Sequence, residues 1–279
     1  MSISDTVSKF SGLTDILACP ICRKPFEARG ASLVCCGGHT FDMNKRGYVN
    51  MAPQAKNADF KYDAELFAAR RRVLSGEFYL PVMSALSEFV KEGFAAADVG
   101  CGEGSYLKYL SENSPSSARL FGFDLSRDGV AAAAPCAPRA AVCVADLRRL
   151  PVADGSLDII FNVLTGADYA EFGRALKDGG RLVKVVPAEG YLKEIRALVK
   201  DSLIHKQQET ERVEEYFRTR TSNIEKIQIR NTFSLSADYA SDFLKMTPMT
   251  FGGRADGIAA ADIKEITIAL DILSGQPLR

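Results

Sequence analysis

Short apolar runs alternate with helical segments along the chain from about residue 95 onward. Strands are expected at 95–99, 120–124, 140–145, 157–163 and 181–186. Helices are expected after Gly104, over 128–134 and over 168–177, and a turn at Gly179-Gly180 precedes the last of these strands. Apolar strands separated by helices are typical of a parallel sheet that is covered on both faces. The predicted fold class is therefore α/β.

Further elements are predicted on both sides of this pattern. Helices are expected over 64–74 and 81–92, the second with Pro81 in its first turn, and a long charged helix runs from about Tyr191 to Lys206. Segments 224–235 and 263–273 alternate apolar and polar residues with period two. This alternation predicts strands with one exposed face, antiparallel at the edge of the sheet.

The first sixty residues follow neither pattern. We expect a short N-terminal extension over 1–17, a small domain over 18–50, a polar linker over 51–62 and the α/β body over 63–279. Residues 18–50 are dense in Cys, Gly and turn-forming residues and show no sustained helical period. Some thirty residues of this kind cannot enclose a sufficient core, so the small domain needs a disulfide or a metal to hold it together.

Composition places the chain among globular proteins. It has 279 residues, of which 47% are hydrophobic and 25% charged, which argues against a disordered protein or a fibre. No run approaches the roughly 18 apolar residues of a membrane helix. The N-terminus lacks a basic start followed by an apolar stretch, so we expect no signal peptide, no membrane partner and a cytoplasmic location.

The charges balance overall but not locally. The chain has 35 Lys and Arg against 35 Asp and Glu, so it offers no general attraction to a polyanion. Between Cys19 and Arg72, however, ten basic residues face five acidic ones, a local net charge of +5. A nucleic-acid contact would need such a segment, although a solvated surface has the same composition.

Four residues near the N-terminus have the spacing of a zinc site. Cys19 and Cys22 are followed by Cys35, and His39 lies four residues further on. Three thiolates and one imidazole suit a closed, tetrahedral structural zinc, which builds structure and leaves no open position for catalysis. Seven cysteines without a signal peptide argue against a disulfide framework. Buried free thiols, or Cys36 in place of Cys35, are the alternatives.

A glycine-rich loop follows the first strand of the body. Asp98 precedes Gly100, Gly102 and Gly104, and this spacing differs from the dinucleotide fingerprint G-x-G-x-x-G. Alternate glycines allow a tight turn into a helix and let a ligand lie against bare backbone. The loop resembles the S-adenosylmethionine loop of class I methyltransferases, in which the acid and the glycines receive the amino-acid end of the cofactor. A nicotinamide enzyme or a simple tight turn is the alternative.

Two later strand ends extend this cofactor site. Asp124 ends the second strand, where a carboxylate can accept both ribose hydroxyls. Asp146 and Leu147 follow the third strand, where the methyltransferase fold usually contacts the adenine.

Taken together, the motifs resemble one family. They are CPIC, VCCGGHTFDMNKRGYVNM, AARRRVLSGEFYLP, ADVGCGEG, NVLTGADYAEFGRALKDGG and KMTP. In this order they are similar to the bacterial 23S ribosomal RNA (guanine-N1)-methyltransferases with an N-terminal zinc-binding domain, over residues 18 to 250. The resemblance implies a class I S-adenosylmethionine-dependent methyltransferase with a Rossmann-like sheet and a small zinc ribbon. Its zinc ligands would be Cys19, Cys22, Cys35 and His39, and its cofactor contacts would include Tyr79, Gly102, Glu103 and Tyr191.

The chain departs from the family pattern at two places. Family members often have His where this chain has Tyr191, and a small residue followed by Pro where it has Thr165-Gly166. A tyrosine hydroxyl can still reach the cofactor. The second change lies at the substrate end of the fourth strand and bears on which guanine is the target.

The resemblance also implies a reaction in which guanine N1 loses a proton as it gains a methyl group. Positioning dominates such a transfer, and a base must take the proton. Asp168 is the acid nearest the fourth strand end and is the candidate base, with Asn162 placed to hold the base edge. The alternative for Asp168 is capping of the helix that follows it.

Three functions remain open from the sequence. The first is methylation of a 23S ribosomal RNA hairpin bound by the zinc domain and the basic segment 45–72. The second is methylation of a small molecule or a protein. The third is a catalytically inactive binder of cofactor and RNA. The sequence also leaves a homodimer open.

Overall fold

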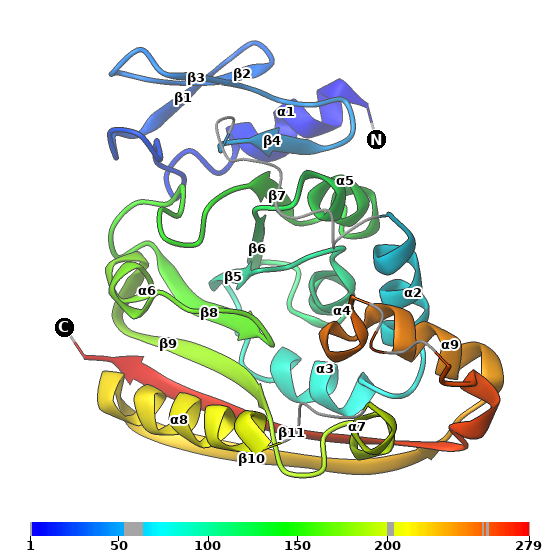
Figure 1. Cartoon of the computed structure of the whole chain (residues 1–279). Helices are drawn as coiled ribbons and strands as arrows, with labels where there is room; N and C mark the ends of the chain where they lie inside the picture. Colours follow the sequence, from blue (N-terminus) through cyan, green and yellow to red (C-terminus); the bar gives the residue numbers. More distant parts are fainter. Residues whose placement is uncertain (1, 53–63, 200–203, 253, 255–256, 279) are drawn as a thin grey trace.

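An eight-stranded mixed sheet forms the centre of the molecule (Figure 1). The computed structural model describes residues 2–52, 64–199, 204–252, 254 and 257–278. In spatial order the strands are β10 (Thr221–Ser234), β11 (Glu265–Pro277), β9 (Leu176–Pro187), β8 (Leu157–Val163), β5 (Ala95–Val99), β6 (Arg119–Asp124), β7 (Ala141–Val144) and β4 (Tyr48–Asn50). All pairs from β9 to β4 are parallel. Strands β10 and β11 are antiparallel at one edge, so the predicted parallel sheet with an antiparallel edge is confirmed.

Side chains of the central strands alternate between two apolar layers. In β5, Ala96 belongs to one layer, whereas Ala95, Ala97 and Val99 belong to the other. All five residues of β5 are buried, which explains why the strand is an apolar run rather than an alternating one.

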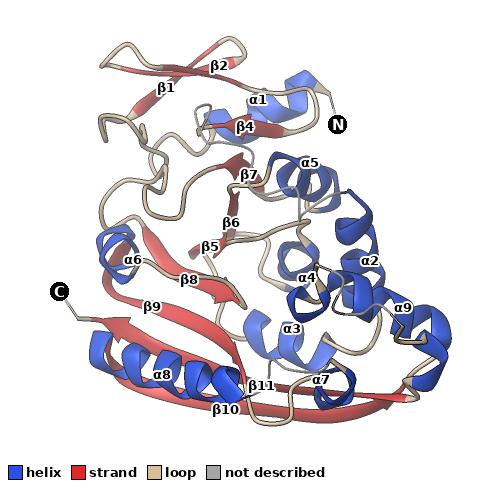
Figure 2. Cartoon of the chain, viewed as in Figure 1, coloured by secondary structure: helices blue, strands red, loops and turns tan. Residues whose placement is uncertain are grey.

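Helices cover both faces of the sheet (Figure 2). They are α2 (Ala64–Leu74), α3 (Leu80–Ser87), α4 (Ser105–Asn113), α5 (Arg127–Cys136), α6 (Tyr169–Ala175), α7 (Lys193–Leu198), α8 (Ile204–Arg220) and α9 (Ala237–Met246). Helices α2 to α5, α7 and α9 supply residues to one layer, and α6 and α8 to the other. The body therefore has the doubly covered architecture that its strand pattern predicts.

Most predicted boundaries differ from the structure by a few residues, and three differences are larger. The helix expected from Tyr191 to Lys206 is divided into α7 and α8, because buried Val199 adopts an extended conformation after α7. Residues 200–203 of that prediction lie outside the described residues. Helix α3 ends at Ser87 rather than near residue 92, and short-range turn hydrogen bonds follow it. The Gly179-Gly180 turn lies inside β9, where the register with β8 shifts.

The N-terminal region packs on the other end of the sheet. Helix α1 (Ile3–Ser11) occupies part of the predicted extension, starts with a capping box between Ser2 and Asp5, and buries Phe10 completely. Strands β1 (Phe26–Arg29), β2 (Ser32–Cys35) and β3 (Thr40–Asp42) form a small antiparallel sheet. Strand β4 follows and pairs in parallel with β7 of the large sheet. Most of the predicted linker, residues 53–62, lies outside the described residues.

An ion pair is among the side-chain contacts that join the small sheet's region to the body. Arg23, with φ of 63°, donates to both carboxylate oxygens of Glu171 in α6, at 3.2 and 3.1 Å. The same carboxylate also accepts from the Leu150 amide at 2.7 Å and from Arg174. Burial opposes its charge, but hydrogen bonds from Arg174 and Arg23 lower the pKa of Glu171 below its usual value. Glu171 is therefore a buried anchor that is fully paired with donors.

Within the part of the chain that the structure describes, no helix is both long and apolar enough to span a membrane.

Candidate active site and metal centre

Strand β5 carries, next to its last residue, a buried carboxylate that has no partner. Asp98 is 2% exposed, and neither of its carboxylate oxygens has a hydrogen-bond partner among the described residues. Burial, reinforced by the negative charge of Asp124, raises the pKa of Asp98 to about 7. A buried polar group normally has a partner, so this carboxylate is suited to receive a cationic ligand group.

The glycines of the loop after β5 are required by their surroundings. Gly100 and Gly104 both have φ of 85°. A Cβ at Gly100 would lie 2.6 Å from the Thr165 side chain, and one at Gly104 would lie 2.7 Å from Ala133. The chain can make this turn into α4 only with bare backbone at these positions.

Asp124 holds the loop in place from the end of β6. One of its carboxylate oxygens accepts from the Gly102 amide and the other from the Ser126 amide, each at 2.8 Å. Burial raises the pKa of Asp124 in spite of these hydrogen bonds. Each oxygen can accept a further hydrogen bond, so the carboxylate can serve the loop and a ligand together.

The other residues predicted to contact the cofactor also lie at this edge of the sheet. Glu103 is 1% exposed and is paired with Arg71 and with the Ser105 hydroxyl. Asp146 follows β7 and forms a salt bridge with Arg148, which lowers its pKa. Leu147 is partly buried beside it.

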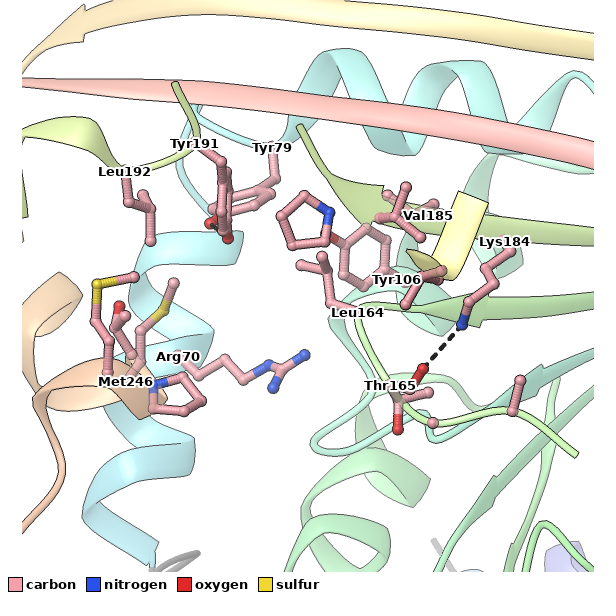
Figure 3. Close-up of a pocket in the computed structure, with 18 of the residues that line it drawn as sticks. Arg70, Tyr79, Tyr106, Leu164, Thr165, Lys184, Val185, Tyr191, Leu192 and Met246 are labelled. Atoms are coloured by element: carbon pink, nitrogen blue, oxygen red, sulfur yellow. Dashed lines mark hydrogen bonds between the residues drawn. The ribbon is translucent and has the colours of Figure 1, made fainter. Parts of the chain in front are cut away.

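A cavity of about 820 Å³ opens beside the carboxyl ends of β8 and β9. Tyr79 and Tyr191 lie on one side of it and their hydroxyl oxygens are 2.7 Å apart, whereas Thr165 and Lys184 lie on the other side (Figure 3). Of the predicted cofactor residues, only Tyr79 and Tyr191 line this cavity. The other eight, Asp98, Gly100, Gly102, Glu103, Gly104, Asp124, Asp146 and Leu147, are not among its lining residues.

Two lining residues that the sequence did not single out connect the cavity to the loop. Arg70 of α2 points into the cavity (Figure 3), and its Nε lies 4.0 Å from a Glu103 carboxylate oxygen. The buried hydroxyl of Tyr106 has no hydrogen-bond partner among the described residues. Three successive arginines point in different directions on a helix, so the spacing alone could not identify Arg70.

The two predicted catalytic residues do not line this cavity. Asn162 is fully buried; its amide nitrogen donates to the carbonyls of Val99 and Gly166, and its oxygen accepts from Lys184. The Asp168 carboxylate accepts from the Glu171 amide at 3.0 Å and caps α6. Asp168 borders a second cavity, with Arg174 and Lys177. Asp168 therefore caps α6, as the alternative interpretation of this residue expected.

The predicted metal ligands form one cluster. The ligand atoms of Cys19, Cys22, Cys35 and His39 all lie within 4.8 Å of one another. Cys22 and Cys35 sulfurs are 3.6 Å apart, and His39 Nδ1 is 3.4 Å from the Cys35 sulfur. Tetrahedral bonds of about 2.0–2.3 Å to zinc put ligand atoms roughly 3.5–3.8 Å apart, so these two separations are those expected of a zinc site. Cys36 is exposed and outside the cluster.

Comparisons with known proteins agree with this division of the chain. The family described as "RlmA, N-terminal", a zinc ribbon, matches residues 17–58, and the family described as "Methyltransferase domain" matches residues 97–185. A chain from the Haloferax volcanii complex of the Trm112 methyltransferase activator with a methyltransferase superposes with a TM-score of 0.50. It is 20% identical, over 80% of this chain and 100% of that chain, a likeness that shows the fold.

Two curated relatives extend over nearly the whole chain. A Bacillus subtilis protein that its name assigns to the 23S rRNA (guanine-N1)-methyltransferases is 36% identical, over 92% of this chain and 95% of its own. The 23S rRNA (guanine(748)-N1)-methyltransferase of Streptomyces fradiae is 28% identical, over 94% and 97%.

The sheet, the glycine loop and the domain matches define a class I methyltransferase fold that uses S-adenosylmethionine and has an N-terminal zinc ribbon. More specifically, the chain belongs to the family of the 23S rRNA (guanine-N1)-methyltransferases.

The cluster predicts one zinc per chain. Cys22→Ser should reduce the zinc content from one equivalent to nearly none, because a hydroxyl is a poor replacement for a thiolate and metal ligation supplies folding energy in so small a unit. Cys36→Ser is the matched control and should keep the full complement. Metal analysis of the two purified variants checks this, and a full zinc content in Cys22→Ser would remove that residue from the ligand set.

Proposed function

We propose that this protein transfers a methyl group from S-adenosylmethionine to N1 of a guanine in 23S ribosomal RNA. The observation that carries the proposal is the buried, unpartnered carboxylate of Asp98 beside a glycine loop, in a chain of this family. The names of the relatives support guanine N1 as the acceptor.

The residues at the loop fit S-adenosylmethionine. Asp98 would receive the cofactor ammonium, and the unpartnered Tyr106 hydroxyl and the Arg70 guanidinium lie where a carboxylate could be bound. Asp124 would accept the ribose hydroxyls, and Asp146 with Leu147 would border the adenine. The cofactor supplies a methyl group on a sulfonium centre. Tyr79 and Tyr191, hydrogen-bonded to each other, complete the wall at this end.

The other end of the cavity suits a flat base. Tyr169 and Tyr216 and the apolar residues Leu164 and Pro187 line it. Enzymes that modify a base inside a folded nucleic acid extrude it and hold it between aromatic or apolar side chains. A small-molecule or protein substrate would have no evident need for a zinc ribbon fixed to the body, and the family favours RNA.

We further propose that the RNA element is a hairpin held by the zinc ribbon and the basic segment. Lys45 and Arg46 are exposed in the connection between β3 and β4, and Arg72 is exposed on α2, whereas Arg70 of the same helix points into the cavity. Phosphate contacts from such residues would position the RNA while the cavity receives one base. A ribosomal substrate also accounts for the expected cytoplasmic location. A homodimer remains a proposal without a specific contact to support it.

A deletion strain tests the function. The 23S ribosomal RNA of this strain should lack one 1-methylguanine by mass analysis. The purified protein with S-adenosylmethionine should restore that methyl group in vitro. An unchanged set of methylated guanines would contradict the RNA reaction and leave the small-molecule or protein alternative. Loss of the methyl group in cells with no turnover in vitro, despite cofactor binding, would point to the inactive binder.

Asp98 should make cofactor binding depend on pH. The ammonium group prefers the ionised carboxylate, whose pKa without ligand is about 7. Affinity should therefore be about half of its plateau value at pH 7 and fall by up to about tenfold per unit below it, as the carboxylate becomes protonated. Asp98→Asn should weaken binding by about 1.5–3 kcal/mol, tenfold or more, and remove the pH dependence. Calorimetric titrations between pH 5.5 and 7.5 measure both, with Asp146→Asn as a control that keeps the slope.

Charge reversal tests the RNA surface. Lys45→Glu combined with Arg46→Glu should lower RNA affinity and flatten its salt dependence, since every phosphate that the pair no longer neutralises reduces the slope of log affinity against log salt by roughly 0.7–0.9. The control reverses Lys91 and Lys108, which lie on the body away from the ribbon. Filter binding at several salt concentrations gives both quantities. Equal affinities and slopes for the two double variants would mean that the pair is ordinary solvated surface.

A further inference from the structure

The cavity that would hold the guanine contains no conventional base. None of its lining residues in the described part of the chain is Asp, Glu, His or Cys. Its ionisable lining groups are Arg70, Tyr79, Tyr106, Tyr169, Lys184, Tyr191, Arg196, Arg212 and Tyr216. Removal of the N1 proton therefore depends on a tyrosine, an arginine, a lysine or solvent.

Lys184 is the group in this set whose geometry fits proton transfer. It lies in β9, is 4% exposed, and donates from Nζ to the Asn162 side-chain oxygen and to the Thr165 carbonyl, the latter at 3.0 Å. Asn162 is itself fixed by hydrogen bonds to Val99 and Gly166. Two acceptors thus orient two N–H bonds of Lys184. The remaining position on Nζ, which is the lone pair of the neutral amine, is left for the cavity that Lys184 lines (Figure 3).

The electrostatic surroundings favour the neutral amine. No salt bridge to Lys184 occurs among the described residues, and the other charged lining groups, Arg70, Arg196 and Arg212, are cations. Burial lowers the pKa of Lys184 to about 8. An amine with such a pKa is near the working range of a general base, as general acid–base catalysis requires.

The other candidates are less suitable. Burial raises the pKa of Tyr79, Tyr106 and Tyr191, and it raises that of Tyr169 to about 12, so these phenols remain protonated. Arginine stays charged at any working pH. Asp168 caps α6 beside the second cavity.

We infer that Lys184, as the neutral amine, is the catalytic base that accepts the N1 proton of the bound guanine; this rests on the function proposed above. The N1–H bond breaks and its proton joins the Nζ lone pair of Lys184. The N1 electron pair forms the bond to the methyl carbon of S-adenosylmethionine, and the sulfur–carbon pair returns to sulfur, which leaves as a thioether. The Lys184 ammonium formed in this way loses its proton to solvent after product release. Asn162 and Thr165 act as positioning residues for Nζ.

A pH–rate profile tests the inference with the full-length protein, 23S ribosomal RNA transcribed in vitro and saturating cofactor. The wild-type single-turnover rate should rise about tenfold from pH 7 to a plateau above pH 8, as the neutral amine becomes the major form. The single-turnover rate of Lys184→Arg should be lower than that of the wild type by about a hundredfold or more, and it should not rise between pH 7 and pH 8. The matched control Lys177→Arg changes a more exposed lysine of the same strand, paired with Asp158, and should keep the wild-type profile.

A Lys184→Arg variant with the wild-type rate, or with the same rise, would overturn the inference, because the guanine's own ionisation would then explain the pH dependence. Wild-type protein that forms no 1-methylguanine on this RNA would instead mean that the proposed function has failed.

Two measurements keep the test informative if buried arginine disturbs folding. Lys184→Ala leaves space for a small amine, and added methylamine or ethylamine should restore turnover in proportion to the neutral amine present. In the wild type, the pH dependence of Lys184 labelling by an amine-reactive reagent, followed by peptide mass spectrometry, should have its midpoint near pH 8 without any turnover. Absence of rescue in a folded Lys184→Ala protein, or a labelling midpoint near that of an ordinary exposed lysine, would overturn the inference.

Discussion

Parallel strands end at the same edge of a sheet, and this constraint brings the site together. Asp98 lies one residue before the end of β5 and Asp124 ends the neighbouring β6, while Thr165 follows β8 and Lys184 lies in β9, on the other side of β5. Residues separated by up to 86 positions in sequence, as Asp98 and Lys184 are, thus lie at one edge of the sheet. The glycine loop fits this edge because Gly100 packs against Thr165, so the loop after β5 and the segment after β8 are in direct contact.

Burial shifts the pKa values of Asp98 and Lys184 in opposite directions, and in both cases it favours the uncharged form. It raises the pKa of Asp98 and lowers that of Lys184, so each charge is less favoured in the absence of a ligand. A cationic cofactor group would restore the charge on Asp98, whereas the cationic arginines around the cavity leave Lys184 without such compensation. The proposed roles of Asp98, which would bind a cation, and of Lys184, which would exchange a proton, are therefore compatible within one apolar site.

Much of the fold and part of the site could be predicted from local sequence. Strand β5 and helix α2 have the predicted bounds, since an apolar run and a helical period are local signals. The zinc cluster was predictable because its ligands lie within 21 residues of one another. Lys184 was not, because a lysine inside the run RLVKVV has no local sign that it is buried. The split between α7 and α8 and the docking of α1 depend on tertiary packing at Val199 and Phe10.

The bridge between Arg23 and Glu171 also bears on how a target guanine would be selected. It fixes the loop that carries Cys19 and Cys22 to α6, and β4 joins the same region to the large sheet, so the ribbon cannot swing freely relative to the cavity. If the ribbon binds the RNA backbone, the distance between that contact and the cavity is fixed. The shape of the RNA would then determine which guanine lies at this distance and reaches the cavity.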